Sequence, residues 1–307
     1  MKNITLIFLN IKIRTLVLWT ILGMIIPLAV MGIFFPAEKI TELLATPEYL
    51  LLTIIMGFIP LALFIFTSFK LKIHLGKTLW EDFKSIPWKD VFILTPLFIF
   101  FSMGIGFSTQ YLMLLVAPEW AVATFKASEV HGLNGENWVL RILSLFAVII
   151  AAPINEELMF RGIFTHRLRK HGWGWLAVGV PSIIFGLLHP FDPLGKILFG
   201  LMMVFIYLKT QNILFPWAIH FLNNAIAGIM SQVDNLPLAD LEYSSEVYYP
   251  LLPWFGILAL VTFPFLLLYF NKYKPQGQAV KLNRSESEYL GEVYRQDQTK
   301  PSESWRY

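Results

Sequence analysis

The chain has 307 residues, of which 56% are hydrophobic and 15% are charged, and its formal net charge is +3. A soluble globular domain carries about 25% charged residues, so this chain lacks the polar surface that water requires, and a bilayer is its expected solvent. The small net charge, with no basic stripe that alternates with aromatic residues, argues against a nucleic-acid partner. The chain has no cysteine, which excludes disulfides, thiolate nucleophiles and cysteine-bound zinc.

Long apolar runs predict an all-α, polytopic membrane protein. A helix needs about 20 apolar residues to cross the hydrocarbon core, whereas an open sheet could not satisfy its edges in lipid. We predict one integral membrane domain at residues 1–271 and a polar, disordered cytoplasmic tail at 272–307. The first run lacks a small-residue cleavage pattern, so we interpret it as a retained helix, with a signal peptide as the alternative. The eight predicted transmembrane spans are 15–35, 49–69, 91–116, 138–160, 173–189, 194–208, 212–231 and 249–271.

The positive charges alternate between the two sides of these eight spans. The segments on the side of the N-terminus hold 20 of the 24 Lys and Arg side chains. Because cytoplasmic loops carry the excess of Lys and Arg, both termini are predicted to be cytoplasmic. We expect the cell membrane as the location.

Three of the predicted spans carry polar residues that a bilayer disfavours. An ionisable side chain at the centre of the bilayer costs roughly 2.5–3.5 kcal/mol on insertion scales, so such residues usually have a function. The fourth span reads FAVIIAAPINEELMFRG and contains Glu156 and Glu157. The fifth, PSIIFGLLHP, ends near His189, and the seventh, FPWAIHFLNNAIAG, contains His220 and Asn224.

Helical geometry separates the two glutamates. Glu157 and Arg161 are four residues apart and share a helix face, in the order that favours an ion pair. Glu156 points away from that face at 100° per residue, and we expect it to face the interior of the bundle. If the helix continued through about Arg169, Glu156 and His189 would reach the same depth, and we expect that it does. The alternative is that both glutamates are helix-end groups neutralised by Arg161.

The other polar residues also come in pairs at helical spacing. His220 and Asn224 share one helix face, and Phe185 lies one turn before His189, where it is expected to pack under the imidazole. His189 precedes Pro190 and could instead be a solvated helix cap. His220 and Asn224 could instead serve only to join helices.

This combination of side chains suits the hydrolysis of a peptide bond. A buried carboxylate can act as a general base on water, and a nearby His can hold the same water. A second His and an Asn amide can donate hydrogen bonds to the oxyanion that forms. The sequence has no GxSxG, GxGD or HExxH motif, so other intramembrane peptidase chemistries are poorly supported.

Three motifs resemble a known family. EExxxR at Glu156–Arg161, FxxxH at Phe185–His189 and HxxxN at His220–Asn224 follow one another on successive hydrophobic segments. In this order they resemble the CAAX protease and bacteriocin-processing family of intramembrane glutamic endopeptidases, also called Abi. Its members include prenyl-protein endopeptidases that remove the last three residues of CAAX proteins. The resemblance covers about residues 138–231.

The resemblance implies a glutamate-dependent peptidase and assigns a role to each motif residue. Glu156 and His189 would activate the attacking water. His220 and Asn224 would stabilise the oxyanion. The supporting residues would be Glu157, Arg161 and Phe185.

The expected reaction needs no cofactor. Glu156, His189 and His220 could in principle bind zinc, but we expect no metal because the typical metallopeptidase arrangement with an independent base is absent. The expected partners are the lipid bilayer and a membrane-associated peptide or protein substrate. Two alternatives stay open at this point: an ion- or proton-coupled transporter or channel, and a non-catalytic immunity or binding protein on the same scaffold.

Overall fold

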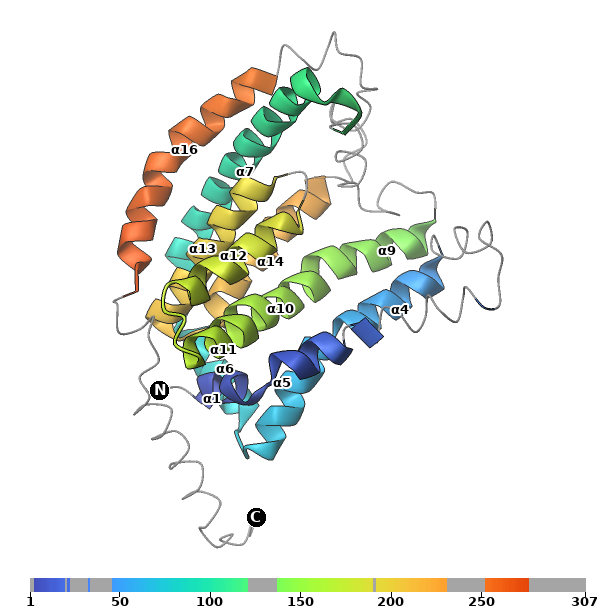
Figure 1. Ribbon diagram of the computed structural model, residues 1–307, viewed down its shortest axis with the longest axis vertical. Coiled ribbons are helices and arrows are strands. Elements are labelled where there is room, and N and C mark those ends of the chain that lie inside the picture. Colours follow the sequence, from blue (N-terminus) through green and yellow to red (C-terminus); the bar gives the residue numbers. More distant parts are fainter. Residues whose placement is uncertain are drawn as a thin grey trace, which may run out of the picture.

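The computed structural model describes residues 3–19, 21–22, 33, 46–120, 137–189, 192–230 and 252–275. Within these ranges every regular element is a helix, which confirms the predicted all-α class. The helices lie side by side as a bundle, and α16 runs along α7 (Figure 1). Two segments, η1 and η2, are π-helices. The elements are α1 (Asn3–Asn10), α4 (Pro47–Gly57), α5 (Ile59–Lys70), α6 (Leu75–Lys84), α7 (Trp88–Val116), α9 (Trp138–Phe146), η1 (Ala147–Ala151), α10 (Ala152–Glu156), η2 (Glu157–Phe164), α11 (Thr165–Lys170), α12 (Leu176–Leu187), α13 (Pro193–Thr210), α14 (Leu214–Met230) and α16 (Leu252–Tyr273).

Five helical segments of the described chain are long and apolar enough to cross a membrane. Two more apolar helices, α12 and α14, are shorter. A polytopic membrane protein is therefore confirmed, but a count of eight spans is not. Most of the first predicted span, and residues 276–307 of the predicted tail, lie outside the described residues. The five segments are Pro47–Lys70, Trp88–Val116, Trp138–Lys170, Pro193–Thr210 and Trp254–Tyr273.

Several helices begin at residues whose side chains cap the first turn. The Thr46 hydroxyl accepts a hydrogen bond from the amide of Tyr49 before α4. Asn137 caps α9 through the amides of Val139 and Leu140. Asp192 caps α13 through the amide of Gly195. Polar caps satisfy amides that have no partner within the helix, and here they set where each segment starts.

The segment that carries both glutamates is one continuous helix of 33 residues, Trp138–Lys170. The prediction that this helix extends through about Arg169 is confirmed, although the apolar run itself ends near residue 160. Its winding is not uniform, because η1 and η2 are π-helical on either side of α10. A π-helical turn is rare and often occurs at functional sites. Glu156 and Glu157 lie at the junction of α10 and η2, near the middle of the segment.

Helix α12 is too short to cross a bilayer. Its 12 residues span about 18 Å, whereas the hydrocarbon core is about 30 Å thick. The predicted fifth span began at residue 173, but Gly172 and Gly174 adopt positive φ angles of 80° and 56° and form a turn there instead. The 12 residues of α12 therefore cannot reach both faces of a bilayer, and His189 follows its last turn.

Candidate active site

Glu157 is the centre of a buried polar cluster. Its Oε1 atom lies 2.8 Å from His220 Nδ1 and 3.1 Å from Arg161 Nη1. The side chains of Glu157 and Arg161 are 1% and 0% exposed, so both charges are out of contact with solvent. The predicted Glu157–Arg161 ion pair is confirmed. Since a carboxylate cannot donate to a ring nitrogen, His220 Nδ1 carries a proton and donates it to Glu157.

The Phe185 ring joins the histidines to Arg161. The Arg161 guanidinium lies 4.4 Å from the centroid of the Phe185 ring. The centroid of the His189 ring lies 4.6 Å from the same Phe185 centroid. Phe185 therefore packs against His189 as predicted. Phe199 on α13 also contacts the site, with its centroid 5.2 Å from that of His220. Sequence reasoning missed Phe199, because it lies in an ordinary apolar run that carries no distinguishing signal.

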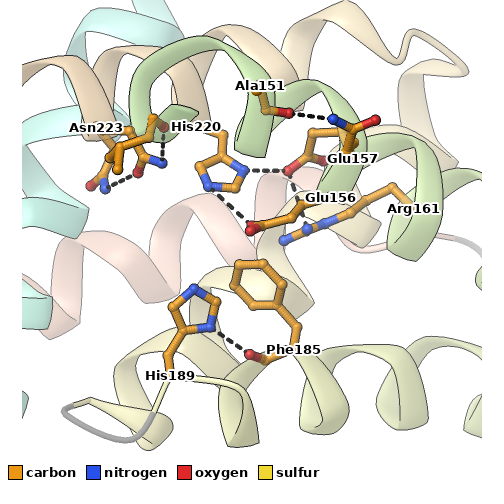
Figure 2. Close-up of polar contacts among 11 residues, drawn as sticks. Ala151, Glu156, Glu157, Arg161, Phe185, His189, His220 and Asn223 are labelled. Carbon is orange, nitrogen blue, oxygen red and sulfur yellow. Dashed lines mark hydrogen bonds and ion pairs between the residues drawn. The ribbon is translucent and has the colours of Figure 1, made fainter. Parts of the chain in front are cut away.

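Glu156 is the more accessible glutamate. Its side chain is 26% exposed, and its Oε2 atom lies 3.6 Å from His220 Nε2 (Figure 2). With Nδ1 donating to Glu157, an unprotonated Nε2 would direct a lone pair toward a carboxylate. A proton on either group, or a bridging water at this separation, removes that repulsion. His220 thus contacts Glu157 through Nδ1 and Glu156 through Nε2, and a proton can be held between His220 and Glu156.

His189 is oriented by the backbone of its own helix. Its Nδ1 donates to the carbonyl oxygen of Phe185 at 2.7 Å, which leaves Nε2 as the outward-facing nitrogen. Figure 2 shows the His189 ring and the Glu156 carboxylate turned toward the same region beside Phe185. The charge of Glu156 acts on His189 through space. His189 therefore lies near Glu156 in the bundle, as expected for two residues at the same depth.

Asn224 reaches the glutamate-bearing helix from α14. Its Nδ2 atom donates to the carbonyl oxygen of Val148 in η1 at 2.9 Å, and its Oδ1 lies 3.3 Å from Nδ2 of Asn223. An amide nitrogen has two N–H groups, so Asn224 has a second donor in addition to the one that Val148 accepts. His220 and Asn224 both contact the segment Trp138–Lys170, as expected for residues that share a helix face.

The site residues divide by their access to solvent. Glu156, His189 and Asn224 are partly exposed, whereas Glu157, Arg161 and Phe185 are buried and His220 is 4% exposed. The accessible groups are a carboxylate, an imidazole and an amide, which can bind a water molecule and a peptide carbonyl. Across the described ranges, no group of three His, Cys, Asp or Glu side chains is arranged to hold a metal ion.

A comparison with protein families identifies the region that holds this site. The model of the type II CAAX prenyl endopeptidase Rce1-like family matches residues 137–226. This range contains every residue of the three sequence motifs, and the match confirms the predicted resemblance to the CAAX protease family. No curated protein and no solved structure matches the chain.

Proposed function

We propose that this chain, which over residues 137–226 is similar to the type II CAAX prenyl endopeptidases, is an intramembrane endopeptidase. It would hydrolyse a peptide bond in a membrane-associated protein or peptide. The observation that carries the proposal is the division of the two adjacent glutamates. Glu157 is buried and neutralised by Arg161, whereas the side chain of Glu156 is 26% exposed overall and its Oε2 atom is buried beside His220.

In the proposed reaction, Glu156 removes a proton from water as the water attacks the peptide carbonyl. The outward Nε2 of His189 accepts a hydrogen bond from the same water and fixes its position. His220, protonated on Nε2, and the second N–H of Asn224 donate to the oxyanion. The proton taken up by Glu156 then passes to the leaving amine, so that the peptide bond breaks and the carboxylate is regenerated.

The buried cluster supplies orientation and charge balance. Two carboxylates and one guanidinium carry one net negative charge, which the second ring proton of His220, on Nε2, offsets in the proposed reaction. The bond between His220 Nδ1 and Glu157 keeps Nε2 aimed at the reacting groups. Phe185 and Phe199 surround His220 and Arg161 and exclude water from the Glu157 side.

The test compares Glu156→Gln with Glu81→Gln, which removes an exposed carboxylate from α6. Membrane proteomes of cells that carry each variant are searched for a precursor with a hydrophobic or lipidated end. That precursor is then given to the purified, reconstituted proteins. We expect Glu156→Gln to lower the cleavage rate by about 10²–10⁴-fold at unchanged membrane abundance, because the general base is lost. Glu81→Gln should cleave at the rate of the unmodified chain.

Cleavage that persists in Glu156→Gln would refute the proposed base. Solute or proton flux through proteoliposomes that is abolished by Glu156→Gln, without any peptide product, would favour a transporter. Peptide binding that needs all three motifs but yields no product by mass spectrometry would indicate an immunity or binding protein.

A further inference from the structure

A basic pocket lies outside the proposed active site and is lined by residues that follow α1 and by residues of and next to α11. These two helices meet at one end of the bundle (Figure 1). The volume of the pocket is about 360 Å³. Four of its five lining residues have basic side chains. They are Lys12, Arg14, Arg167 and His171, and the fifth lining residue is Ile13.

The pocket has a fixed wall. Arg167, half-buried in α11, donates from Nη1 to the carbonyl oxygen of Leu9 at 2.8 Å and so ties α11 to the end of α1. Helix α1 is itself anchored, since Ile4, Ile7 and Phe8 are fully buried. The opposite wall, Lys12–Arg14, continues directly from α1. The basic side chains are therefore held together by the fold rather than by chance surface conformations.

The charge of the pocket is uncompensated within the described part of the chain. No carboxylate lines it, and no ion pair links its four basic residues to an acid among the described residues. Arg14 and Arg167 repel one another, and Lys170 adds a further positive charge beside Arg167. Like charges held together in this way are stabilised by a bound anion.

The position of the pocket identifies the source of the anion. Arg167 and His171 lie at the end of the membrane-crossing segment Trp138–Lys170. Lys12 and Arg14 immediately precede the first predicted span, 15–35. The pocket therefore lies where the segment Trp138–Lys170 leaves the hydrocarbon core, at the level of lipid headgroups, and basic pockets at that level bind anionic headgroups. We propose that this pocket binds the phosphate group of an anionic membrane lipid.

The experiment measures the binding of phosphatidylglycerol and phosphatidylcholine to the purified full chain in detergent, by native mass spectrometry and by the shift in unfolding temperature. The variant is Lys12→Gln/Arg14→Gln, which removes two charges from the pocket and leaves the Arg167–Leu9 bond in place. The matched control is Lys70→Gln/Lys77→Gln, which removes two exposed charges elsewhere on the described surface. Inorganic phosphate is titrated in parallel.

We expect phosphatidylglycerol to bind saturably and to raise the unfolding temperature, and phosphatidylcholine to do neither. Each basic side chain near an anionic lipid contributes roughly a fivefold factor, so the pocket variant should bind phosphatidylglycerol roughly 30-fold more weakly. The control variant should keep its affinity. Equal losses in both variants, or no loss in either, would overturn the pocket assignment. Saturable binding of inorganic phosphate that blocks no lipid binding would overturn the lipid as the source of the anion.

Discussion

The buried Glu157–Arg161 pair allows a quantitative test of the site's architecture. Arg161 is 0% exposed, lies 3.1 Å from Glu157 and stacks on Phe185 at 4.4 Å. Replacement of Arg161 by Met fills much of the same volume and preserves contact with the ring, but it leaves the carboxylate of Glu157 buried without its partner. Loss of one partner of a buried pair costs about 3–5 kcal/mol, so we expect Arg161→Met to lower the free energy of unfolding by that amount.

The double variant Glu157→Gln/Arg161→Met isolates the charge effect. The new glutamine side chain would keep an oxygen that accepts from His220 Nδ1 but would carry no charge. Since removal of both charges of a buried pair is often nearly neutral, the double variant should be more stable than either single variant. Lys272→Met is the control: it removes a 2.5 Å ion pair in which the lysine is 54% exposed and the Asp90 carboxylate is 8% exposed. Asp90 keeps the hydrogen bonds from Tyr269 and Tyr273, so this loss should cost less than the loss of the fully buried pair.

The assay is reversible unfolding in detergent micelles, followed by tryptophan fluorescence. Free energies of unfolding are compared for the unmodified chain, the two single variants, the double variant and the control. If Arg161→Met cost no more than Lys272→Met, or if the double variant lost the sum of the two single effects, the ion pair would not have the role described.

Four further predictions concern packing and chemistry. A Cβ at Gly104 would lie 2.6 Å from the backbone nitrogen of Ala259, so Gly104→Ala should separate α7 from α16 and cost about 1–3 kcal/mol in unfolding experiments. Gly57→Ala, with nothing within 4 Å of the new Cβ, should instead stabilise α4 by up to about 1 kcal/mol. Gly162→Ala would overlap the Phe8 ring, and a smaller loss in Gly162→Ala/Phe8→Ala than the two single losses predict would identify this contact as the cause. Cleavage should survive millimolar chelator, whereas activity that is lost with chelator and restored by zinc would contradict hydrolysis without a metal.

The sequence predicted which residues lie close together in the site. It predicted less well the helix winding and the packing that place them there. Glu156, Glu157, His189 and His220 could be identified because they are ionisable residues within apolar runs. The free-energy cost of burying such a side chain depends on the residue type and can be recognised from the sequence. The continuation of the fourth helix was also predictable, since the depth of His189 required it. The number of spans, the orientation of the termini and the catalytic roles stay predictions.

Features that depend on winding and packing could not be read from the sequence. The angle of 100° per residue assumed for Glu157 and Arg161 fails in η2, yet the pair forms because residues four apart are also neighbours in a wider turn. The apolar runs around α12 suggested a full span, whereas a turn at Gly172 and Gly174 shortens it. Phe199 contacts His220 only because α13 packs beside α14, a tertiary contact without a local sequence signal.

The π-helical winding of η1 requires a specific number of residues in this segment, and that number affects the geometry of the site. A π-turn holds more residues than an α-turn, and the carbonyl oxygen that accepts from Asn224 lies within η1, at Val148. Deletion of one residue from Ala147–Ala151 would favour an ordinary α-helix. The faces of α9 and of the glutamates would stay nearly in register, because the deleted residue is the one that the wider turn holds in excess. No motif residue would change, yet the oxygen that holds the Asn224 amide would be lost. The wide turn of η1 therefore presents the oxygen to which Asn224 donates, and a one-residue deletion in this stretch would remove that contact while every motif residue stayed in place.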